Sequence, residues 1–82
     1  MRGTGPVRVN KEEVYGYYSS EGDSLRLRLS LDEWDRLGLC QGQQVKVGLP
    51  GRELCNMLIT TETNTPPVIW LDLRPMNLAR AG

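Results

Sequence analysis

The hydrophobic pattern changes its period within the segment SLRLRLSLDEWDRLGL, which runs from Ser24 to Leu39. Its first half has a leucine at every second position, which is typical of a strand with one buried face. Its second half places Leu31, Trp34 and Leu37 at the spacing of one helix face. The sequence therefore predicts a strand that leads directly into a short helix.

Both ends of this helix carry capping signals. Ser30 and Glu33 have the spacing of a capping box, in which each side chain accepts from the backbone N–H of the other residue. Gly38 can adopt the left-handed conformation that ends a helix. Because the helix has only about two turns, packing rather than intrinsic propensity must stabilise it.

Further strand-like runs lie on both sides of this unit. They are Val7–Val9, Val14–Tyr18, Val45–Leu49, Leu54–Thr61 and Val68–Leu73. Glycine-containing turns at residues 19–23 and 49–52 indicate two hairpins. The pattern predicts a mainly β fold with one short α-helix, arranged as a small β-barrel or as paired hairpins.

The chain has 82 residues, which is one domain near the lower limit of what folds alone. We expect a single β-rich domain at residues 7–75, with a flexible N-terminus at 1–6 and a flexible tail at 76–82. A chain of this size buries only about 60% of its unfolded surface. We therefore expect a homodimer to complete the core.

Two cysteines, Cys40 and Cys55, and no histidine are present. One chain therefore lacks the ligands of a structural zinc site, and we expect neither a metal nor another cofactor. No apolar segment approaches the roughly 20 residues of a membrane span, and the N-terminus lacks the apolar core of a secretory signal. We expect a cytoplasmic protein whose cysteines are reduced and buried.

Catalysis is not expected. Without histidine the chain lacks the side chain that normally titrates near neutral pH, and it has no glycine-rich phosphate loop. Asp32, Glu33 and Asp35 form an acidic cluster, which the helix cap and a solvated helix face explain. An enzyme that used these carboxylates would require a pocket that raises their pKa values.

Four basic residues are candidates for nucleic-acid binding: Arg26, Arg28, Arg36 and Lys46. The two strand arginines stand on the outward face of the leucine strand, about 7 Å apart along the chain. Such a patch can bind phosphate groups. The alternative is a charged outer face that keeps a small sheet soluble, since ten basic and ten acidic side chains give no net charge.

Three aromatic residues are candidates for a protein interface. Tyr15 and Tyr17 share one face of their strand, and Trp70 lies opposite the apolar face of the last strand. Trp70 could cover a second core layer or contact a partner subunit. Trp34 shares the apolar face of the helix and is expected in the core.

The order of turn, strand, short helix and second strand resembles the AbrB/MazE-type swapped-hairpin domain. The residues that carry the resemblance are Gly22, Leu25–Leu29, Leu31–Leu37, Leu37-Gly38-Leu39 and Gln41–Val47. The similarity covers about half of the chain, from Ser20 to Ile59.

This resemblance implies an intertwined homodimer in which hairpins from two chains form one barrel. It also implies binding to duplex DNA as a transcription regulator or antitoxin, with Arg26, Arg28 and Arg36 near the DNA. The chain departs from the family at Asp23 and Asp35, which stand where basic residues are common.

The sequence thus favours a non-catalytic binding module. The first hypothesis is an AbrB/MazE-like DNA-binding regulator or antitoxin. The alternative is a protein–protein interaction module with no nucleic-acid binding. Such a module could add a partner strand at an exposed edge around Val68–Leu73 or at the tyrosine-rich strand.

Overall fold

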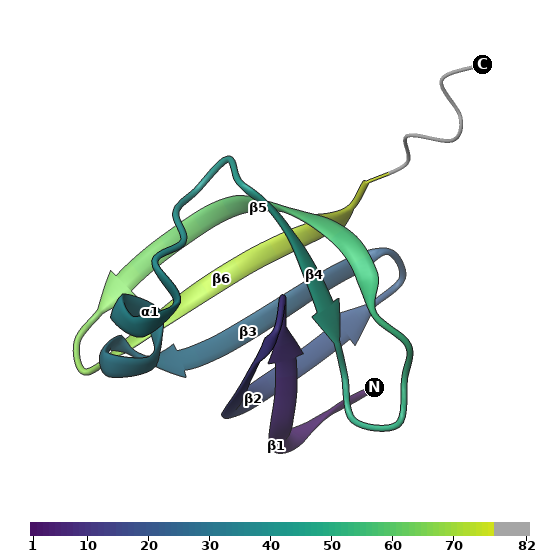
Figure 1. Cartoon of the computed structure of the whole chain (residues 1–82), viewed down its shortest axis with the longest axis horizontal. Helices are drawn as coiled ribbons and strands as arrows, with labels where there is room; N and C mark the ends of the chain where they lie inside the picture. The colour runs from purple at the N-terminus through teal and green to yellow at the C-terminus, as the bar shows by residue number, and fades with distance from the viewer. Residues whose placement is uncertain (77–82) are drawn as a thin grey trace.

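The structure, a computed structural model, describes residues 1–76. It contains six strands and one short helix (Figure 1). In chain order these are β1 (Arg2–Val9), β2 (Glu12–Glu21), β3 (Ser24–Ser30), α1 (Leu31–Leu37), β4 (Gln44–Gly48), β5 (Cys55–Thr65) and β6 (Val68–Pro75). The predicted fold class, a mainly β barrel with one short helix, is confirmed.

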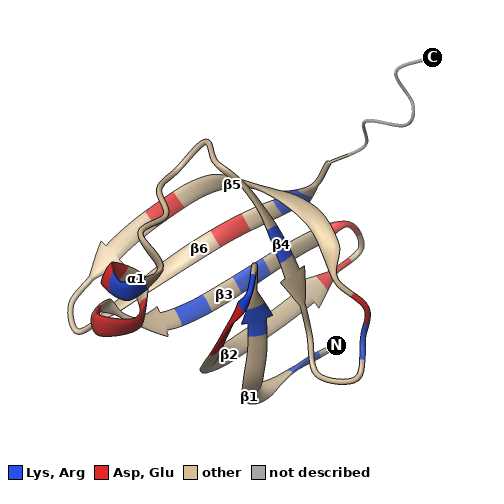
Figure 2. Ribbon diagram, in the orientation of Figure 1, with Lys and Arg blue, Asp and Glu red and all other residues tan. Residues whose placement is uncertain are grey.

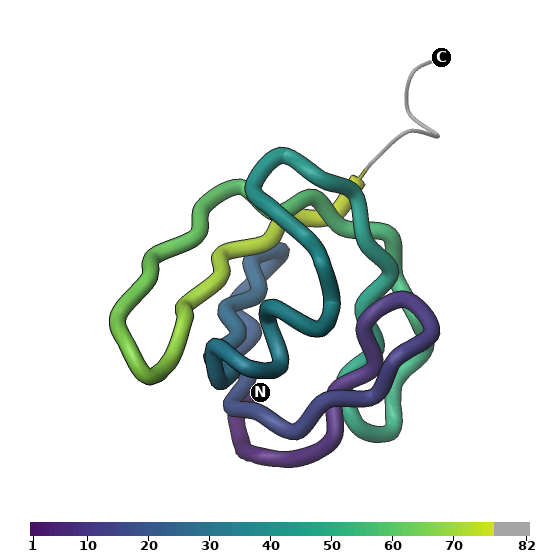
Figure 3. The backbone as a smooth tube through the Cα atoms, turned by 60° about the vertical axis from the view of Figure 1, so that its left-hand side comes forward, coloured from purple at the N-terminus to yellow at the C-terminus, as the bar shows by residue number. Residues whose placement is uncertain are grey.

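The six strands form one closed antiparallel barrel in the spatial order β1-β2-β3-β6-β5-β4. The chain first makes the meander β1–β2–β3, then passes through α1, and then makes the meander β4–β5–β6. Figure 3 shows the β5–β6 hairpin on one side of the molecule and the β1–β2 hairpin on the other. Two pairings, β3 with β6 and β1 with β4, join the meanders and close the barrel.

The inward side chains of β3 and β6 form the centre of the core. They lie directly opposite one another as the pairs Leu25–Leu73, Leu27–Leu71 and Leu29–Ile69. All of these side chains are buried. A later strand of the same chain therefore covers the leucines of β3, so a second copy is not needed for that purpose. The swapped-hairpin homodimer stays a prediction.

Helix α1 packs on β3 and β6 at one end of the barrel and buries Trp34 in the core. Ser30 Oγ accepts a hydrogen bond from the Glu33 N–H at 3.2 Å, as predicted. The helix ends at Gly38, which has a φ of 68° and donates its N–H to the Trp34 carbonyl at 3.3 Å. The Glu33 carboxylate, which the predicted capping box directs to Ser30, pairs instead with Arg36.

The expectation of a flexible N-terminus at residues 1–6 is wrong, because β1 already begins at Arg2. Gly3 lies opposite Tyr18 of β2, and a Cβ at Gly3 would lie 2.9 Å from the Tyr18 hydroxyl oxygen. Glycine here permits a close approach of the tyrosine ring and does not loosen the chain. β1 also pairs on both sides, so the run Val7–Val9 is not in an edge strand.

The expected flexible tail, residues 76–82, lies outside the described residues except for Met76. The Met76 N–H donates to the Asn56 carbonyl at 2.9 Å. No helix in the described part of the chain is long and apolar enough to cross a membrane.

Cys40 and Cys55 are both free and exposed, so the expectation that they are buried is wrong. Cys40 lies in the turn after α1, where its backbone N–H donates to Gln43 Oε1 at 2.8 Å. Cys55 is the first residue of β5. The general tendency of cysteine to be buried does not apply at these two chain positions, which lie in or beside loops.

The glycine pair in the β1–β2 sheet provides a test of the packing. Gly5 and Gly16 are cross-strand partners. A Cβ at Gly16 would lie 2.6 Å from the Arg28 carbonyl oxygen and 2.7 Å from Leu29 Cδ2, whereas at Gly5 the nearest atom would be Pro50 Cγ at 3.7 Å.

We predict that Gly16→Ala lowers the free energy of unfolding by about 1–3 kcal/mol, because overpacking displaces β2 from β3. The matched control Gly5→Ala should change the free energy of unfolding by less than about 1 kcal/mol. This substitution can raise the free energy of unfolding, because alanine reduces the entropy of the unfolded chain. Urea denaturation of both variants measures the difference. An equal decrease of the free energy of unfolding in the two variants would contradict the close packing of β2 on β3.

Candidate nucleic-acid interface

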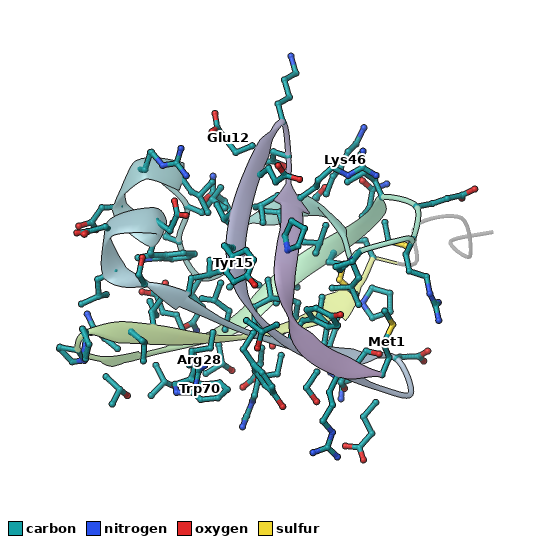
Figure 4. The ribbon with its side chains drawn as sticks, turned by 90° about the horizontal axis from the view of Figure 1, so that it is seen from below. Met1, Glu12, Tyr15, Arg28, Lys46 and Trp70 are labelled. Carbon is teal, nitrogen blue, oxygen red and sulfur yellow. The ribbon has the colours of Figure 1, made fainter. Side chains whose placement is uncertain are left out.

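The outer face of β2, β3 and β6 carries two of the predicted site arginines next to two aromatic rings. The alternation that buries the leucines of β3 places Arg26 and Arg28 outside. Arg28 lies between Tyr17 of β2 and Trp70 of β6 in the strand register. We call Tyr17, Arg26, Arg28 and Trp70 the arginine–aromatic face; Figure 4 shows Arg28 beside Trp70.

Cation–π contacts order these side chains. The guanidinium carbon of Arg28 lies 5.4 Å from the centroid of the Tyr17 ring and 5.6 Å from that of Trp70. The guanidinium carbon of Arg26 lies 5.6 Å from the Trp70 centroid. The two rings meet edge to face, with centroids 6.0 Å apart and an interplanar angle of 71°. Each guanidinium group is attracted to the face of the ring beneath it, so the four side chains hold one another in place.

The two arginines differ in their charge environment. Arg26 Nε lies 2.9 Å from Asp72 Oδ1, and this hydrogen bond and the carboxylate charge raise the pKa of Arg26. Arg28 has no carboxylate at ion-pair distance among residues 1–76. Arg28 is therefore the cation of this face whose charge is available to an anionic ligand.

A shallow hollow of about 410 Å³ lies next to Arg26 at the β2–β3 turn. Its lining includes the carboxylates of Glu21 and Asp72 together with Ser19 and Ser24. Negative charge at this end of the face disfavours a phosphate group beside Arg26. An anionic ligand would therefore be placed closer to Arg28.

Lys46 lies on the opposite side of the barrel from the arginine–aromatic face. It belongs to β4, which is three strands away from β3 in either direction around the barrel. Its backbone is held by Asn10, whose Oδ1 accepts from the Lys46 N–H at 3.0 Å. Figure 4 shows Lys46 far from Arg28 and Trp70.

Arg36 is also separate from the face. It pairs with Glu33 in α1, and its Nη1 lies 3.5 Å from Glu12 Oε1 at the start of β2. Glu12 is roughly 17 Å along β2 from Tyr17, at the usual rise of a strand. The hydrogen bond from Arg36 to Glu33 and the charge of Glu33 raise the pKa of Arg36. The structure thus brings together two of the four predicted basic residues.

The predicted interface aromatics occupy different environments. Tyr15 is 66% exposed and pairs in register with Pro6 of β1. Tyr17 and Trp70 are half-buried by the arginines. Trp70 therefore lies under arginine side chains and does not cover a second core layer. The expected free edge at Val68–Leu73 is wrong, since β6 pairs with both β3 and β5.

Sequence reasoning missed three charged residues around the face. Arg2 lies opposite Ser19, which in turn lies opposite Arg26, and Arg74 follows Asp72 on the outer side of β6. The alternation of residues along β6 is the signal that could have indicated that Asp72 and Arg74 lie on its outer side. Their position next to β3 follows from a pairing between distant segments, for which the sequence carries no local signal.

Charges of both signs are spread over the whole barrel (Figure 2). In the helix, Asp32 and Asp35 are exposed and Glu33 pairs with Arg36. Within residues 1–76 no three histidine, cysteine or carboxylate side chains gather in an arrangement that could hold a metal ion.

No family model, no curated protein and no solved structure matches this chain. The resemblance to the AbrB/MazE-type domain rests on the sequence pattern alone and stays a prediction.

The two tryptophans allow the geometry of the face to be tested by fluorescence. Trp34→Phe leaves Trp70 as the only tryptophan. We predict that iodide quenches it more strongly than caesium at equal ionic strength, when each is scaled to its quenching of free tryptophan, because two guanidinium groups lie over the ring.

The control is Trp70→Phe, which leaves Trp34 with 8% exposure. Its fluorescence should be quenched weakly by both ions. Scaled caesium quenching of Trp70 that equals or exceeds scaled iodide quenching would contradict the placement of the arginines over the ring.

Proposed function

We propose that this protein is a non-catalytic module that binds nucleic acid through the arginine–aromatic face. The observation that supports this proposal is the position of Arg28 between Tyr17 and Trp70, without a carboxylate partner among residues 1–76. A guanidinium group binds phosphate through a planar set of donors, and aromatic rings provide surfaces on which bases stack. The combination fits a ligand that is both anionic and aromatic.

A role as a transcription regulator or antitoxin, a homodimeric state and a cytoplasmic location stay predictions from the sequence. The first two come from the AbrB/MazE resemblance and the small size of the chain. The proposal of nucleic-acid binding rests on the residues of the arginine–aromatic face and does not depend on these three predictions.

A protein-interaction module is the second candidate, because Tyr15 is 66% exposed. Tyrosine is enriched among the residues that dominate the binding energy of protein interfaces. Since the barrel is closed in the part of the chain that the structure describes, a partner would contact side chains and would not add a strand. Tyr15 stands outside the arginine–aromatic face, so Tyr15→Ser should leave nucleic-acid binding unchanged.

Fluorescence anisotropy with short labelled DNA and RNA oligonucleotides tests the proposal. Arg28→Gln should weaken binding about tenfold at low salt and reduce the slope of log affinity against log salt by about one, as expected for one lost phosphate contact. The matched control is Lys46→Gln, which removes the same charge on the opposite side of the barrel. It should change the affinity less than about twofold.

Two results would overturn nucleic-acid binding through this face. One is the absence of binding to every oligonucleotide at low salt, which would leave the protein-interaction module as the better-supported function. The other is an equal loss of affinity in Arg28→Gln and Lys46→Gln, which would indicate nonspecific attraction to total charge.

A further inference from the structure

We infer that the ligand of the arginine–aromatic face is a single-stranded nucleic acid, held mainly by stacking of its bases, and that duplex DNA binds more weakly. This inference rests on the proposed function and specifies its ligand. Three properties of the described residues support it: the small available positive charge, the acidic character of the short helix, and the arrangement of the two rings.

The available charge is too small for a duplex-binding surface. A protein that contacts about 6–10 phosphates of a duplex depends on a similar number of cations. On this face Arg26 is paired with Asp72, and Arg28 is the arginine without an ion-pair partner among residues 1–76. Arg2 and Arg74 flank the face, and Glu21 lies beside it. Phosphate contacts therefore provide only part of the affinity.

Helix α1 does not suit the major groove of DNA. That groove admits an α-helix or a two-stranded ribbon that inserts its side chains. Helix α1 has seven residues, of which three are acidic and one is basic (Asp32, Glu33, Asp35 and Arg36). Arg36 is already paired with Glu33 and Glu12. The acidic first turn of this helix would repel the phosphates on both sides of a groove.

The two rings are placed for contact with unpaired bases. Tyr17 and Trp70 stand in one row of outward side chains that crosses the barrel through Thr4, Tyr17, Arg28, Trp70 and Thr63. The threonines at its ends are short, and the Arg28 guanidinium group lies over both rings, which stay partly exposed. Bases stack on aromatic rings and on guanidinium planes, and both are available only to a base that is not inside a duplex.

Single-stranded DNA and RNA share the chemistry that this face recognises, namely exposed bases joined by phosphates. The 2′-hydroxyl group is the feature that distinguishes them. A comparison of the affinities for a DNA strand and an RNA strand of the same length shows which of the two nucleic acids the face prefers. Tighter binding of either strand than of the duplex supports the inference.

The test compares three probes: a labelled oligo-dT strand, an oligo-rU strand of the same length, and a duplex of the same length. The full chain should bind at least one single strand about tenfold or more tightly than the duplex. In the Trp34→Phe background, binding of the strand should quench the fluorescence of Trp70.

Trp70→Leu should weaken single-strand binding about tenfold, the effect of losing one stacked base, while the salt slope stays unchanged. Trp70→Phe retains a ring and should restore most of the affinity. Circular dichroism of both variants confirms that the barrel is folded. This pattern differs from that of Arg28→Gln, which changes the salt slope.

The failures of the inference and of the proposed function are distinguishable. Binding to the duplex that equals or exceeds binding to both strands, or unchanged single-strand affinity in Trp70→Leu, would overturn the inference while nucleic-acid binding stands. The absence of binding to all three probes would overturn both.

Discussion

The pairing of β3 with β6 is the interaction on which the rest of the structure depends. Its inner side places Leu27 against Leu71 and closes the core, and its outer side places Arg28 against Trp70. One register therefore determines both the stability of the barrel and the composition of the candidate site. A shift by one residue would expose the leucines and bury the arginines, so the burial of the leucines fixes the position of the arginines.

Local features of the sequence predicted local structure well. The leucine alternation, Ser30 and Gly38 predicted β3, the start of α1 and its end, because each signal acts within a few residues. The fold class followed from the number of strand-like runs. The closure of the barrel did not follow, because β3–β6 and β1–β4 pair segments that are distant in the chain. The first half of β1, residues 2–6, was missed for the same reason, since Gly3 acquires its role only beside Tyr18.

The candidate site was predictable to the same extent. Alternation alone placed Arg26 and Arg28 on one surface, and the structure keeps them together. Lys46 was grouped with them as a candidate, whereas the barrel order puts β4 on the far side. The contacts of Trp70 with both arginines and the ion pair of Arg26 with Asp72 depend on β6, whose neighbours the sequence does not specify.

Closure of the barrel by β3 and β6 of one chain is tested most directly by isotope-filtered NMR on a mixture of labelled and unlabelled protein. We predict that nuclear Overhauser effects between the backbones of Leu27 and Leu71 arise within one chain and are absent from the interchain spectrum. Strong interchain effects between these two residues would contradict it, since the core would then be completed by a strand from a second copy.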